Sequence, residues 1–104
     1  MMNAAPDAEA VWAVLRSIPD PEVGINIVDL GLIYSVECQG ADITVVMTLT
    51  TPNCPSGGWI HAGIQRAVEG LPGAGRVDVQ LVFDPPWTPE MLSDDAQRQL
   101  GRRE

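Results

Sequence analysis

The sequence predicts an α/β (α+β) two-layer sandwich, with a mixed three-stranded sheet and helices on one of its faces. Apolar residues recur at helical spacing in two segments and alternate with polar residues in three others. Proline and glycine clusters separate these segments, which gives the order α-β-β-α-β followed by a short C-terminal helix. Because one helix returns the chain between the second and third strands, those two strands should be parallel. The sequence does not indicate which edge of the hairpin the third strand joins.

The first half of the chain contains one helix and a hairpin. A helix is predicted over residues 7–17, and a loop rich in Pro, Gly, Asn and Asp follows over residues 19–31. Residues 32–38 and 43–49 alternate as strands do, and Gly40 suits the turn between them. In the first strand the alternation places four residues on one face: Leu32, Tyr34, Val36 and Cys38.

The second half contains a helix, a strand and a short final helix. Pro55 suits the first position of the second helix. Five apolar residues form one stripe of that helix: Ile60, Ile64, Ala67, Val68 and Leu71. Residues 77–83 alternate as the third strand, which Pro85 and Pro86 end. Ser93 can cap the last helix, because acidic residues follow it and arginines lie further on.

The length of 104 residues fits one domain over residues 1–104. Residues 1–6 are expected to be flexible, and residues 85–104 to form a Pro-rich segment and the C-terminal helix. No apolar run approaches the ~18–20 residues that cross a bilayer, and the first residues lack a signal-peptide pattern. We therefore expect a cytoplasmic protein without a membrane partner.

The charge of the chain bears on its partners. The sequence has 14 acidic residues and six basic ones, for a formal net charge of −8. Such a surface repels phosphate backbones at long range, so we expect no nucleic-acid binding. Solubility is the simplest interpretation of the acidity.

The two cysteines are too few for a disulfide framework, and their contexts differ. Cys54 directly precedes Pro55 at the predicted start of the second helix. Unpaired backbone N–H groups there would stabilise a thiolate, which is the form that binds a soft metal. The alternative is that Cys54 only caps the helix. Cys38 is in phase with the apolar residues of its strand, which predicts an inert core thiol.

Three carboxylates lie in the loop before the first strand. Asp20, Glu22 and Asp29 could bind a hard cation on this proline-stiffened loop, or they could only shape its turns. His61, the single histidine, is seven residues from Cys54, or roughly 10 Å along a helix. That separation is too large for both to bind one ion, and we expect a surface histidine.

Trp87 is held in an extended segment by the prolines of Asp84 to Pro89. Its indole could cover the sheet edge. Alternatively, Trp87 could be a rigid partner-binding anchor, because Trp is enriched at interface hot spots.

Three segments together resemble one known family. Asp20 to Tyr34 is similar to the opening signature of the SufT-like metal–sulfur cluster biosynthesis domain, which also occurs in PaaD proteins and in the eukaryotic cytosolic iron–sulfur targeting machinery. Met47 to Pro55 and Asp84 to Met91 resemble its second and third signatures. The chain departs from the family pattern at Asn53, where glycine is usual, and at Gly57-Gly58-Trp59.

The resemblance implies an α/β domain with no established catalytic reaction. It also implies that the protein is an accessory factor in iron–sulfur cluster assembly or in the maturation of iron–sulfur proteins. The reactive cysteine of the family maps onto Cys54 and its nearby threonine onto Thr51. The acidic loop maps onto Asp20, Glu22 and Asp29. The implied partners are the assembly machinery and client proteins.

The resemblance implies no tightly bound cofactor. One reactive cysteine cannot supply the four ligands usual for a cluster. Iron or a cluster on Cys54 would therefore be bound transiently, or its remaining ligands would come from a second copy in a homodimer, from carboxylates or small thiols, or from a client. Two other functions stay open: a non-catalytic adaptor that docks assembly machinery onto clients through Trp87 and the acidic surface, and a small thiol enzyme. No base for such an enzyme is recognisable in the sequence.

Overall fold

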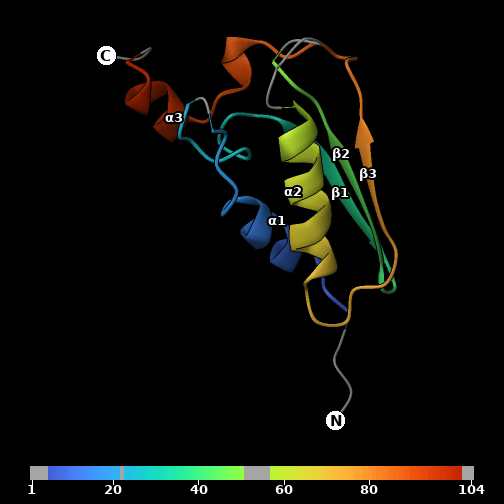
Figure 1. Cartoon of the computed structure of the whole chain (residues 1–104). Coiled ribbons are helices and arrows are strands. Elements are labelled where there is room, and N and C mark those ends of the chain that lie inside the picture. The colour runs from blue at the N-terminus through green and yellow to red at the C-terminus, as the bar shows by residue number, and fades with distance from the viewer. Residues whose placement is uncertain (1–4, 22, 51–56, 102–104) are drawn as a thin grey trace.

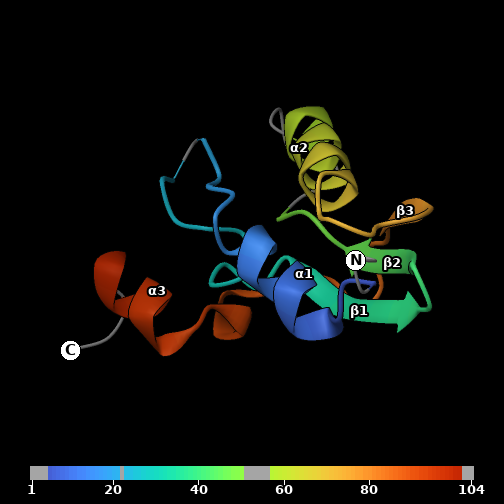
Figure 2. The ribbon, with the colours of Figure 1, turned by 90° about the horizontal axis from the view of Figure 1, so that it is seen from below.

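The computed structural model describes residues 5–21, 23–50 and 57–101. Its elements are α1 (Ala8–Leu15), β1 (Ile33–Gln39), β2 (Asp42–Met47), α2 (Gly57–Glu69), β3 (Val77–Leu81), the 3₁₀ helix η1 (Pro89–Met91) and α3 (Asp94–Gln99). The predicted class and order are confirmed, because α1 and α2 pack on one face of a mixed three-stranded sheet (Figures 1 and 2). The short α3 lies to the side of the sheet (Figure 1).

The central strand of the sheet is β2. It pairs antiparallel with β1, through a turn in which Gly40 has a left-handed φ of 60°. On its other side β2 pairs parallel with β3, as predicted. The strand order is therefore β1-β2-β3, which settles the edge that the third strand joins.

A bulge shifts the predicted alternation of β1. Ile33 lies opposite Met47 and Ser35 lies opposite Val46, so Tyr34 is an extra residue on this strand. Since one extra residue exchanges the two faces of a strand, Ile33 takes the core-facing position that the alternation assigned to Tyr34. Ile33 is buried, whereas Tyr34 is half-buried. The prediction for Tyr34 was therefore wrong, because a bulge leaves no mark in an apolar alternation.

The core lies between the helices and the face of the sheet that they cover. Its largest fully buried apolar side chains come from α1, α2, the central strand and the loop before β1: Val11, Leu15, Ile27, Leu32, Ile43, Val45, Met47, Ile60, Ile64 and Val68. The apolar stripe predicted for α2 is confirmed at its three most buried positions. Within the described residues, no helix is long and apolar enough to cross a membrane.

Two side chains of α2 cover the free edge of β3. Gln65 Nε2 donates to the carbonyl of Val77 at 2.9 Å, and His61 Nε2 lies 3.0 Å from the carbonyl oxygen of Val79. Because a carbonyl can only accept, Nε2 of His61 carries the hydrogen in this contact. His61, expected at the surface, is half-buried at the sheet edge, a contact that the sequence did not indicate. These contacts satisfy two carbonyls that an edge strand leaves open.

Candidate functional site

The connection between β2 and α2 carries the residue with the sharpest predicted chemistry. Cys54 and Thr51 themselves lie outside the described residues, but both flanks of the connection are described. A Cβ built on Gly57, the first residue of α2, would lie 2.6 Å from Cδ1 of Leu49. A side chain at this position would force the buried Leu49 side chain to shift. The segment that follows β2 and the start of α2 therefore lie next to each other, beyond the carboxyl ends of β2 and β3 (Figure 1).

Cys38 cannot join a site at that end of the sheet. It lies opposite Ile43, next to the hairpin turn, and β2 runs about 13 Å from Ile43 to Met47 before the chain continues to the connection. The thiol is half-buried and packs against the core, in line with the prediction of a core thiol. Burial raises the pKa of the Cys38 thiol, and the nearby carboxylate of Asp7 raises it further. Cys38 is thereby kept protonated and poorly reactive.

Asp20 shapes the loop before β1 through its backbone. Its carbonyl accepts a hydrogen bond from the N–H of Gly24 at 2.7 Å, and its N–H donates to Ile25 at 3.0 Å. Gly24 has a left-handed φ of 83°, which suits glycine. The residue is only 4% exposed. Glu22, the second predicted acidic residue, lies outside the described part of the chain.

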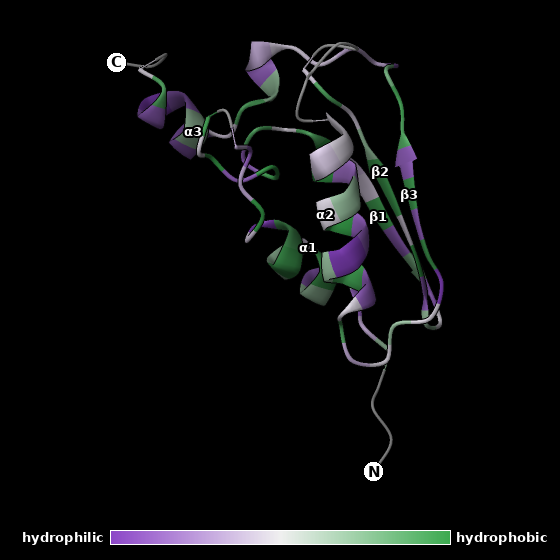
Figure 3. Cartoon of the chain, in the orientation of Figure 1, coloured by the Kyte–Doolittle hydropathy of each residue, from purple (hydrophilic) through white to green (hydrophobic). Residues whose placement is uncertain are grey.

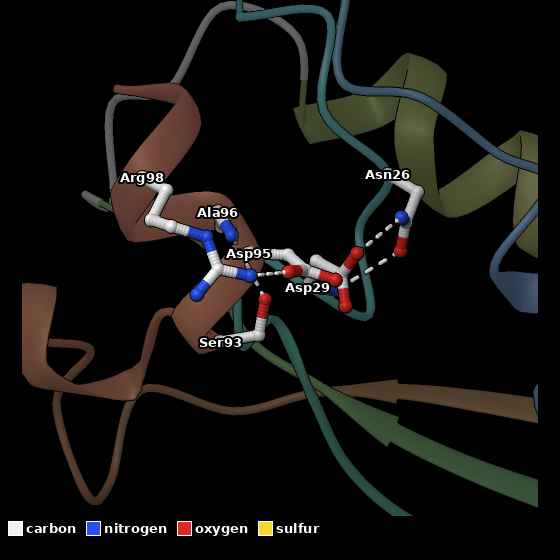
Figure 4. Close-up of polar contacts among 6 residues, drawn as sticks. All are labelled: Asn26, Asp29, Ser93, Asp95, Ala96 and Arg98. Carbon is white, nitrogen blue, oxygen red and sulfur yellow. Dashed lines mark hydrogen bonds and ion pairs between the residues drawn. The ribbon is translucent and has the colours of Figure 1, made fainter. Parts of the chain in front are cut away.

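Asp29 links the loop to the C-terminal segment. Asn26 Nδ2 donates to Asp29 Oδ2 at 2.8 Å, and the N–H of Asp29 donates to Asn26 Oδ1 at 2.9 Å (Figure 4). The carbonyl of Asp29 accepts from the N–H of Ser93 at 2.8 Å. Ser93 in turn caps α3, as predicted, since its Oγ accepts from Ala96 N at 3.1 Å (Figure 4). Beside these contacts Arg98 forms an ion pair with Asp95.

Trp87 is fastened to the same loop. Its Nε1 donates to the carbonyl of Leu30 at 2.7 Å, and the half-buried indole packs against the core. Close by, a Cβ on Gly31 would run into Met91, so glycine is needed where the two segments cross. Gly31 also has a left-handed φ of 79°.

Tyr34, the bulged residue of β1, completes this attachment. Its hydroxyl donates to the carbonyl of Pro85 at 2.7 Å and lies 3.6 Å from Sδ of Met91. Residues 85–93 are thus held against residues 26–34, and we call this set of contacts the clasp. The clasp joins the first and third predicted signatures, a pairing that no local pattern in the sequence indicates.

The described residues do not assemble a metal site by themselves. No group of three or more His, Cys, Asp or Glu that could hold an ion occurs within residues 5–21, 23–50 and 57–101. Asp20, Asp29, Cys38 and His61 are all inside these ranges.

Comparison with known proteins assigns the family. Residues 8–81 match the family of iron–sulfur cluster assembly proteins. The chain belongs to that family. The resemblance to SufT-like proteins that the three signatures indicated is thereby confirmed, although the match ends before the third signature.

The members most relevant to function are similar over most of their length. A Fe-S protein maturation auxiliary factor from Porphyromonas gingivalis is 43% identical over 95 residues, covering 89% of this chain and 90% of that protein. The Fe-S protein maturation auxiliary factor SufT from Staphylococcus aureus is 41% identical over 83 residues, covering 79% and 94%. A solved domain of unknown function from Bacillus anthracis superimposes with a TM-score of 0.86 at 33% identity, covering 91% and 92%.

Proposed function

We propose that this iron–sulfur cluster assembly family member is a non-catalytic accessory factor in the maturation of iron–sulfur proteins, acting through Cys54. The observation that carries the proposal is the contact between Leu49 and Gly57, because it brings together the two flanks of the segment that holds this cysteine. The relatives from Porphyromonas and Staphylococcus, both named Fe-S protein maturation auxiliary factors, support it. The reducing cytoplasm, which keeps a thiol free, is the compartment that suits this role.

The proposed cargo is iron or an iron–sulfur cluster, held transiently. Since Cys38 lies at the opposite end of β2, one chain offers one thiol at the connection. Clusters are usually held by four protein ligands, so the others would come from the client, from small thiols or from carboxylates. Thr51, Asp20, Glu22 and Asp29 are the candidates for assisting Cys54 within this chain.

Anaerobic reconstitution with iron and sulfide tests the proposal. The wild-type chain should take up a labile, substoichiometric amount of iron with cluster-like absorbance, and Cys54→Ser should lose that uptake. Cys38→Ser is the matched control and should behave as wild type. Equal iron in wild type and Cys54→Ser, or a full stable cluster held by one chain through both cysteines, would contradict the proposal.

A pure adaptor function is the second candidate, and the held indole of Trp87 favours it. Because the hydrogen bond to Leu30 and the neighbouring prolines already fix this side chain, little entropy would be lost when a partner covers it. If the protein is an adaptor, its Cys54→Ser variant should still capture client and assembly proteins. A factor that works through its thiol should lose client maturation in that variant.

A further inference from the structure

The outer face of α2 carries a shallow hollow that the proposed function does not use. It is lined by Trp59, Ala62, Gly63 and Arg66, which share one side of the helix. Its volume of about 280 Å³ is below the ~300–1,000 Å³ of small-molecule pockets, so it suits side chains of a protein. Trp59, Ala62 and Arg66 are exposed, and Figures 1 and 2 show that one side of α2 faces away from both the sheet and α1. The first turns of the helix are pale in Figure 3.

The floor of the hollow, at Gly63, is open on its outer side. A Cβ on Gly63 would meet nothing within 4 Å, in contrast to Gly57, whose missing side chain admits Leu49. Glycine in a helix interior destabilises the helix relative to alanine. Because Gly63 has no side chain, another backbone can approach α2 closely at this place.

Two donor-bearing side chains flank this floor. Trp59 is 57% exposed, and Arg66 is exposed as well. Among the described residues the single salt bridge joins Arg98 to Asp95, so Arg66 has no carboxylate partner in that part of the chain. An indole face and a guanidinium attract each other, most strongly when both leave water.

The spacing of these residues is self-complementary. Residues 59 and 66 are equally far from the midpoint between Ala62 and Gly63. A second α2 laid antiparallel about that midpoint would place each Trp59 opposite the second copy's Arg66, and each Ala62 opposite the second copy's Gly63. The contact between Trp59 and Arg66 would then form twice, as it must in a two-fold interface.

We propose that two copies of the chain associate through this face of α2, in an antiparallel two-fold contact. The contact covers both Trp59 side chains and gives each Arg66 an aromatic partner. It is weak, because one pair of helices buries less than the roughly 800 Å² per partner of a standard interface, and each chain carries a net charge of −8. A dissociation constant between about 10 µM and 1 mM is expected, and salt should tighten the dimer because it screens the long-range repulsion.

This dimer is independent of the proposed function. In an antiparallel pair the two Gly57 ends lie about 16 Å apart along the axis and point in opposite directions. The connections that carry Cys54 therefore start from opposite ends of the contact, and the dimer is not a means of sharing one cluster. Loss of dimer and loss of iron uptake can be measured separately.

Sedimentation velocity from about 10 µM to 1 mM tests the proposal, and the wild-type chain should show a monomer–dimer equilibrium. Trp59→Ala and Arg66→Ala should each weaken association at least about tenfold. The double variant should have the same dissociation constant as the single variant that dimerises less tightly, because both substitutions remove the same contact. Gly63→Gln should abolish the dimer without lowering the melting temperature, because the monomer has room for the side chain.

Matched controls separate this face from general surface effects. Phe83→Ala removes an aromatic residue that is 41% exposed elsewhere, and Arg76→Ala removes another exposed arginine. Both variants should dimerise as the wild type does. A chain that stays monomeric throughout the range, a dimer that Gly63→Gln leaves intact, or fully additive effects of the two single variants would each overturn the proposal.

Discussion

Removal of the indole N–H of Trp87 tests how the C-terminal segment is held. Its Nε1 donates to the carbonyl of Leu30 at 2.7 Å, and Leu30 is only 3% exposed. Trp87→Phe keeps a large ring that excludes water but deletes the donor, so the carbonyl loses its partner at a cost of about 1–3 kcal/mol. For a domain of this size each kcal/mol shifts the melting temperature by roughly 4 °C, so we expect a fall of about 4–12 °C.

Thermal unfolding followed by circular dichroism measures this effect. Trp59→Phe is the matched control, because its exposed indole should change stability by less than about 0.5 kcal/mol. Trp87→Ala should melt lower than Trp87→Phe, since it also removes packing. If Trp87→Phe melted together with the wild type, the hydrogen bond would not fasten the segment. A pull-down of client proteins with the same variants, at a temperature where both are folded, shows separately whether Trp87 is a partner anchor.

Two further predictions concern the cysteines and the glycines of α2. Under native conditions an alkylating reagent should label Cys54 well before Cys38, as measured by mass spectrometry, because the raised pKa of Cys38 leaves less thiolate at neutral pH. The rate at which Cys38 is labelled should increase only as the pH rises. Equal labelling of the two cysteines at neutral pH would contradict this. Gly63→Ala should raise the free energy of unfolding by about 1 kcal/mol, whereas Gly57→Ala should lower it, because its Cβ would lie 2.6 Å from Leu49. Denaturant titrations that give both variants the same sign would refute the reasoning.

The sequence predicts what depends on local periodicity. The apolar stripe of α2 and the cap at Ser93 follow from residues a few positions apart, and the structure has both. The parallel path of β3 follows from the helix that precedes it, and it is also present. The class follows as well, because the order of helices and strands leaves few ways to cover one sheet.

The sequence does not predict contacts between distant segments. The bulge at Tyr34 depends on how β1 meets β2, and the position of His61 depends on where the edge of β3 lies. Both are set by tertiary packing, which an alternation or a helical stripe does not encode. The hydrogen bonds from Trp87 to Leu30 and from Tyr34 to Pro85 each join residues more than 50 positions apart.

These distant contacts change how the three signatures should be weighed. The carbonyl of Asp29 accepts from the N–H of Ser93, and the indole of Trp87 donates to Leu30, so both residues help to hold the first and third signatures together. A loss of function after substitution of Asp29 or Trp87 would therefore need a stability measurement before it could indicate chemistry. The second signature differs at Leu49, whose side chain packs against the start of α2, although the N–H of the preceding Thr48 donates to the carbonyl of Leu32 at 2.8 Å. Cys54, which follows Leu49 in this signature, is the residue whose substitution should separate function from folding.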